Sequence, residues 1–160
     1  MPGYGTDDGA TAYWAAAGYT VPAGTIAAAR QRGSVYLDGT YGVRFPGVPA
    51  GGYAQERAWP RSGAVDYYGN DIPADVIPDA VTNASYEAAL IELQAPGSLS
   101  VTTTPGKVKR RVRVEGAVEV EYAVGSGAGS VADQQPIAGI IEGMLRAFLV
   151  EANVPGAMVV

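Results

Sequence analysis

The residues most able to do chemistry form one basic run, from Lys107 to Arg113. It contains five of the eleven Lys and Arg residues of the chain, and such a run can bind the phosphates of a nucleic acid. Aromatic side chains, on which the bases of a single strand stack, do not alternate with the basic ones. Because Glu119 and Glu121 follow closely, we favour a solvated strand face neutralised by these acids over a nucleic-acid site.

Catalytic and metal-binding chemistry has few candidates, because the 160 residues include no histidine and no cysteine. The commonest general base, the thiolate nucleophile and the usual zinc ligands are therefore missing. Four carboxylates lie between residues 66 and 79, but their spacing matches no calcium loop. A glycine-rich stretch at 125–129 lacks the Lys-Ser/Thr ending of a phosphate loop. We expect no enzymatic activity, no cofactor and no metal.

The overall charge and hydropathy narrow the class of protein further. Sixteen acids against eleven bases give a net charge of −5, which argues against a surface that coats nucleic acid throughout. The first residues are acidic and do not resemble a signal peptide. No apolar run reaches the roughly 20 residues that span a bilayer. We expect a soluble protein that is intracellular at synthesis and has no membrane partner.

Helical periodicity occurs in four stretches, at about 6–17, 23–41, 78–95 and 136–149. Helices in these stretches must position the charged candidates named above. Thr6 and Gly18 suit the cap and the end of the first. Pro78 and Pro96-Gly97 bound the third, whose wide alanine-rich apolar surface predicts a central helix with close neighbours on two sides. The sequence therefore predicts a mainly α fold, a small bundle of about four helices with long loops.

Glycine weakens two of these helices. Gly24, Gly33 and Gly39 lie within the second stretch, and each costs up to about 1 kcal/mol relative to alanine. In the last stretch, for which Asp133 or Gln135 is the expected cap, small residues recur every four positions opposite the apolar face. We interpret this small face as an intramolecular packing seam rather than a subunit contact; its members are Gly139, Gly143 and Ala147.

The chain has 22 glycines and 11 prolines, concentrated in the connections. Residues 43–73, called the arm below, lose all helical periodicity but contain five aromatic residues, which speaks against disorder. We expect an ordered, extended arm with a short hairpin around residues 63–71. Residues 1–150 would form a single domain, with a Gly/Ser-rich flexible linker at 124–135 and an apolar C-terminal tail at 151–160.

Alternating residues predict a β-hairpin at 107–122. A three-residue loop, Val114-Glu-Gly116, places Val112 opposite Val118 on an apolar face. The other face is then a ladder of opposite charges, in which Arg111 meets Glu119 and Lys109 meets Glu121. The candidate charged face of the hairpin comprises Lys107, Lys109, Arg111, Arg113, Glu119 and Glu121.

The order of several motifs resembles tailed-phage head–tail adaptor (head completion) proteins. The motifs are Ala58-Trp-Pro-Arg-Ser-Gly63, Ile72-Pro-Ala-Asp-Val-Ile-Pro-Asp-Ala80 and the helix end Ala88-Ala-Leu-Ile-Glu-Leu93. Ala27-Ala-Ala-Arg30 corresponds to the second helix of that family, Tyr36-Leu-Asp38 to its "ATDYLD"-like segment, and Val118-Glu-Val-Glu-Tyr122 to its strand after the hairpin. The resemblance spans roughly residues 6–149, and relatives are also labelled as similar to a primosomal single-stranded-DNA-binding protein.

The resemblance implies a structural virion protein of the phage neck. Such proteins form a homo-oligomeric ring, commonly of twelve copies, that joins the portal to a stopper or tail-completion protein and surrounds the passing double-stranded DNA. The alternative is a single-stranded-DNA-binding accessory protein that uses the basic strand of the hairpin.

Subunit or portal contacts are expected in the arm and the tail. For Trp59-Pro60-Arg61, the alternative is a loop anchored by Trp59 against the core. The candidate contact residues are Phe45, Tyr53, Trp59, Arg61, Tyr67, Tyr68, Val154, Met158, Val159 and Val160.

Overall fold

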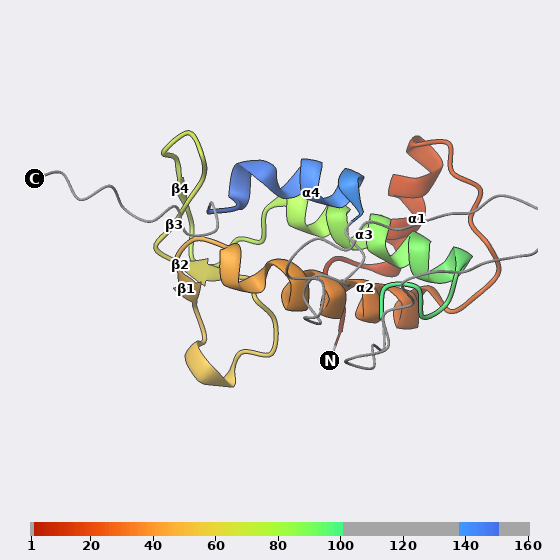
Figure 1. Ribbon diagram of the computed structural model, residues 1–160, viewed down its shortest axis with the longest axis horizontal. Coiled ribbons are helices and arrows are strands. Elements are labelled where there is room, and N and C mark those ends of the chain that lie inside the picture. Colours follow the sequence, from red (N-terminus) through yellow and green to blue (C-terminus); the bar gives the residue numbers. More distant parts are fainter. Residues whose placement is uncertain (1, 101–137, 151–160) are drawn as a thin grey trace, which may run out of the picture.

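The computed structural model describes residues 2–100 and 138–150, which form a small, mainly α fold. Its four α-helices are α1 (Asp7–Ala16), α2 (Ile26–Tyr41), α3 (Asp79–Gln94) and α4 (Gly139–Leu145). Two small antiparallel strand pairs lie at one end of the bundle, and α1 lies at the other (Figure 1). The predicted fold class is confirmed.

Helix α3 is the central element, as its sequence predicts. It begins after Pro78, has Asp79 in its first turn and ends at Gln94, and the chain then turns at the positive-φ Gly97. It packs against α1, α2 and α4, and most of its residues from Val81 to Leu93 are buried. A helix surrounded in this way needs small side chains, which accounts for its alanine content.

Helix α2 packs closely against α3 because Gly33 has no side chain. A Cβ atom at Gly33 would lie 2.8 Å from Ala89 N and 2.9 Å from Ser85 O, both backbone atoms of α3. The adjacent Ser34 hydroxyl lies 2.9 Å from the hydroxyl of Ser85, so a buried polar contact joins the helices at the same level. The glycine that weakens α2 as an isolated helix is therefore required for its packing.

Helix α1 has the predicted cap, and its main core residue is Trp14. The Thr6 hydroxyl accepts a hydrogen bond from Gly9 N at 3.0 Å, and Gly18 adopts a positive φ just beyond the helix. Trp14 is completely buried, and its indole N–H donates to Tyr86 O on α3 at 3.0 Å. Trp14 thus fixes α1 to the central helix by both packing and a satisfied polar group.

Helix α4 differs from its prediction in its start, its end, its buried face and its small residues. It begins at Gly139 after the N-cap Ala138, so the expected caps Asp133 and Gln135 are wrong, and after Leu145 it tightens into the 3-10 helix η4 (Arg146–Phe148). Its buried face is narrow, since Ile141 and Leu145 are fully buried but Ile140 is 51% exposed. A Cβ at Gly139 or Gly143 would meet no described residue within 4 Å, so these glycines form no packing seam with the part of the chain that the structure describes.

The predicted hairpin at 107–122, the linker at 124–135 and the tail at 151–160 lie outside the described residues. Among the helices that are described, none is long and apolar enough to cross a membrane.

Glu92, almost fully buried on α3, organises the end of that helix. Its carboxylate accepts hydrogen bonds from Gly97 N at 3.1 Å, Leu99 N at 3.2 Å and Arg32 Nε at 2.8 Å. Burial by itself would raise the pKa of Glu92, but these three donors together outweigh it and lower the pKa. The ionised form is therefore the one that the fold stabilises.

We expect Glu92→Gln to destabilise the protein by about 1–3 kcal/mol at pH 7, because an amide group replaces an oxygen that faces donors. A lowered native pKa stabilises the fold above the unfolded-state value near 4.3, and this contribution is lost as the pH falls through the native pKa. The difference in the free energy of unfolding between wild type and variant should therefore decrease between about pH 5 and pH 3. Urea unfolding at pH 7 and pH 3.5 measures it, and a gap independent of pH would contradict the assignment.

Candidate functional site

The arm, residues 43–73, contains all four described strands and lies at the end of the bundle opposite α1 (Figure 1). Strand β1 (Val48–Pro49) pairs with β2 (Arg61–Ser62), and β3 (Ala64–Val65) pairs with β4 (Asp71–Ile72), both antiparallel. Short 3-10 helices, η1 (Gly42–Arg44) and η2 (Gly52–Ala54), flank β1. The β3–β4 pair is the hairpin predicted around residues 63–71, and its location is confirmed.

Three of the candidate contact residues hold the arm to its own core. Phe45 and Trp59 are buried in the main hydrophobic cluster, with ring centroids 5.6 Å apart. The buried Arg61 guanidinium donates to the backbone carbonyls of residues 45, 46, 47 and 58, at 2.6–3.2 Å. Burial lowers the pKa of Arg61. These three side chains therefore face the interior, which corresponds to the anchored-loop alternative for Trp59 rather than to an exposed contact.

The other three arm candidates, Tyr53, Tyr67 and Tyr68, point into solvent. Tyr53 is fully exposed, whereas Tyr67 and Tyr68 are 79% and 77% exposed and lie edge to face with ring centroids 5.4 Å apart. Val154, Met158, Val159 and Val160 lie outside the described residues, as does the charged hairpin face from Lys107 to Glu121.

Asp66 fixes the turn that carries Tyr67 and Tyr68. One of its carboxylate oxygens accepts hydrogen bonds from Tyr68 N at 2.9 Å and Asn70 N at 2.8 Å, and the other accepts from the Asn70 amide at 2.9 Å. These bonds, that of the Asn70 side chain first, lower the pKa of Asp66. The role of Asp66 is thus to order the turn, and no group of three metal-ligating side chains occurs in the described residues.

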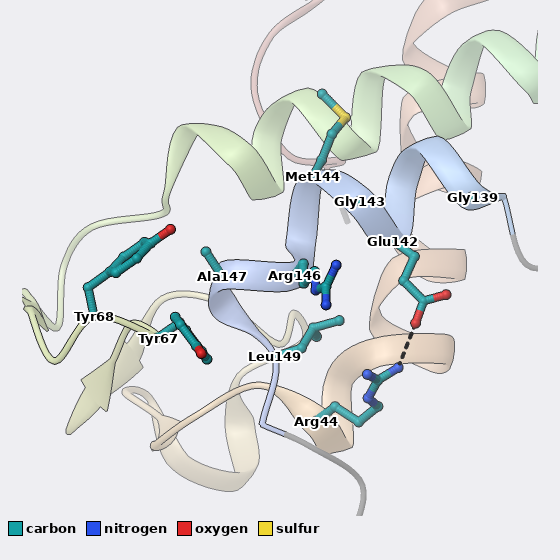
Figure 2. Close-up of a pocket in the computed structure, with 10 residues that line it drawn as sticks. All are labelled: Arg44, Tyr67, Tyr68, Gly139, Glu142, Gly143, Met144, Arg146, Ala147 and Leu149. Carbon is teal, nitrogen blue, oxygen red and sulfur yellow. Dashed lines mark hydrogen bonds and ion pairs between the residues drawn. The ribbon is translucent and has the colours of Figure 1, made fainter.

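A pocket of about 870 Å³ lies beside this turn (Figure 2). Tyr67 and Tyr68 border it on one side, Arg146 projects from η4 in the middle, and Arg44 and Glu142 border it on the other. Arg44 and Glu142 form an ion pair at 3.4 Å. Backbone hydrogen bonds join the β3–β4 turn, the segment around η4, and η1. They run from Tyr67 N to Ala147 O at 2.8 Å and from Val150 N to Arg44 O at 2.7 Å.

The sequence did not indicate Arg44, Glu142 and Arg146 as site residues. Glu142 and Arg146 are four residues apart, which favours an ion pair along one helix. In the structure α4 ends at Leu145, and Glu142 instead pairs with Arg44, nearly a hundred residues away in the chain. The spacing signal alone therefore could not reveal the pocket.

Most cations of the described part are committed to the fold. That part contains eleven acids and six arginines. Four arginines form ion pairs with acids, and Arg61 binds backbone carbonyls. Arg146 is exposed and makes no ion pair with any residue in ranges 2–100 and 138–150. The acids therefore outnumber the arginines in residues 2–100 and 138–150, and only Arg146 is left as an exposed arginine without an ion pair there.

A family model described as "Putative DnaT-like ssDNA binding protein" matches residues 3–160. The chain belongs to this family. No curated protein and no solved structure gave a significant match. The DnaT-like label agrees with the one carried by relatives of the phage adaptors that the motifs resemble, while membership of the adaptor family itself stays a prediction.

Proposed function

We propose that this DnaT-like family member is a structural subunit of a tailed-phage neck, which assembles as a ring between the portal and the next tail component. The observation that carries the proposal is the presentation of Tyr53, Tyr67 and Tyr68 on a segment that is itself anchored. An anchored backbone with solvent-exposed tyrosines is typical of a protein contact surface, because little entropy is lost when such residues bind.

The anchoring is specific to the arm. Arg61 and Trp59 fix its base, and Asp66 fixes the turn at its tip. The arm also has exposed aliphatic side chains, with Val43 95% and Val48 63% exposed. In an isolated subunit these apolar side chains are exposed to water, whereas in a ring the neighbouring subunits would cover them.

The charge distribution supports a conduit more than a DNA clamp. Five of the six arginines described form ion pairs or hydrogen bonds within the subunit, and acidic residues outnumber the arginines there. A wall with this charge would not hold the phosphates of DNA that passes through the ring. The proposed subunit is non-enzymatic, and its location is the virion neck.

Native mass spectrometry and negative-stain imaging of the protein, alone and mixed with its portal, test the proposal. We expect closed rings, and we expect Tyr67→Ser/Tyr68→Ser to weaken assembly at least tenfold while leaving the fold intact. Val35→Ser, at a 55% exposed position of α2, is the matched control. A wild-type chain that stays monomeric beside its portal would contradict the proposal.

Single-stranded-DNA binding is the second candidate, supported by the family description and by the basic run from Lys107 to Arg113. If it is correct, a fluorescent oligo(dT) should bind tightly at low salt. Arg111→Glu should reduce the slope of the logarithm of the binding constant against the logarithm of the salt concentration by about 0.7. Ala15→Glu/Gln31→Glu is the control, because it changes net charge equally at exposed helix positions. Absence of binding at low salt eliminates this candidate.

A further inference from the structure

The pocket between the β3–β4 turn and α4 has the composition of a protein recognition site. Two exposed tyrosines and an exposed arginine line it, and these residue types are enriched where a few side chains provide most of the binding energy. Met144 and Leu149 add apolar surface. The turn held by Asp66 fixes the tyrosine backbone before any ligand arrives.

Electrostatics indicate which ligand fits. Arg146 is exposed without an ion-pair partner in the described residues, and the Arg44 Nε is buried there without a hydrogen-bond acceptor. With Glu142 included, the pocket is locally positive in an otherwise acidic body. An isolated positive site of this size complements one carboxylate rather than a chain of phosphates, which would also meet the acidic β3–β4 hairpin.

The shape of the pocket favours an extended segment. Gly139 and Gly143 present bare backbone along one side, and a Cβ at either position would meet no atom of residues 2–100 and 138–150 within 4 Å. A ligand chain can therefore approach the α4 backbone closely. The tyrosines and Arg146 border the same pocket and would face its side chains (Figure 2).

We propose that this pocket binds an extended acidic peptide segment of a partner protein, in which a carboxylate lies next to an aromatic or aliphatic side chain. The carboxylate would pair with Arg146, and the apolar side chain would pack on Tyr67 and Tyr68. This inference stands on the pocket alone and does not depend on the neck assignment.

The test uses a random peptide library selected on the full-length wild-type chain. Enriched peptides, resynthesised with a fluorescent label, should contain Asp or Glu beside an apolar residue. Their affinity should fall about tenfold or more in Arg146→Glu and in Tyr68→Ala. Arg146→Lys should retain part of the affinity, and Val35→Ser, away from the pocket, should retain all of it. Circular dichroism and thermal unfolding establish that each variant is folded.

Three results would overturn the proposal. The first is a selection whose peptides bind Arg146→Glu as tightly as wild type. The second is enrichment of basic peptides. The third is that a labelled oligo(dT) binds wild type but neither Tyr68→Ala nor Arg146→Glu, while no peptide shows this loss. The pocket would then be a nucleic-acid site. A wild-type protein that forms no ring would leave the peptide result unaffected, so the two proposals fail separately.

Discussion

Ile141→Asp is expected to leave the chain unfolded at neutral pH. Ile141 has no exposed surface and lies in the main core cluster, where α4 packs against α3. A carboxylate at this position would lose its hydration among apolar neighbours, which costs several kcal/mol even if the group becomes protonated. Small domains are stable by only about 5–15 kcal/mol in total, so a loss of this size is enough to prevent folding.

Ile140→Asp is the matched control for this variant. Ile140 is the preceding residue on the same helix but is 51% exposed, so the same change should alter stability by no more than about 0.5 kcal/mol. Circular dichroism and urea unfolding of the two variants measure the difference. An Ile141→Asp protein that remains soluble, helical and as stable as Ile140→Asp would show that the core described for α4 is incorrect.

The parts of the fold that local chemistry determines could be predicted from the sequence. Thr6 caps α1 through its own hydroxyl, Pro78 precedes α3 and Gly97 follows it, and each acts on neighbouring backbone. The β3–β4 hairpin is also local, since its turn is closed by Asp66 and Asn70. Signals of this kind need no knowledge of distant residues.

Contacts between distant segments could not be predicted in the same way. Arg61 and Trp59 are residue types that often form exposed protein contacts. In the structure, however, Arg61 is bound to the carbonyl groups of residues 45–47, and Trp59 is buried in the core cluster. Glu142 pairs with Arg44 across the fold rather than with its helical neighbour, and this pairing helps to form the pocket. Periodicity describes one element at a time, whereas the candidate site is assembled from η1, the β3–β4 turn and α4.

Gly33→Leu is expected to have the second-largest effect, because it tests the contact between α2 and α3. A Cβ at position 33 already lies 2.8 Å from Ala89 N, and the atoms it meets belong to the backbone of α3 and cannot rotate away. A leucine would force the helices apart at the level of the Ser34–Ser85 contact. Overpacking of this kind costs about 1–3 kcal/mol and more when backbone must move, so we expect a loss of about 3 kcal/mol.

Gly39→Leu, on the same helix, separates the packing effect from helix propensity. Gly39 is exposed, and among the described residues a Cβ there would meet nothing within 4 Å. Leucine is a better helix former than glycine, so this variant should gain up to about 0.8 kcal/mol. The two substitutions change the same residue type six positions apart. Relative to wild type, the urea unfolding midpoint should fall for Gly33→Leu and rise for Gly39→Leu. Equal stabilisation by both would mean that α2 and α3 are not in close contact at Gly33, and that its absent side chain has no role in packing.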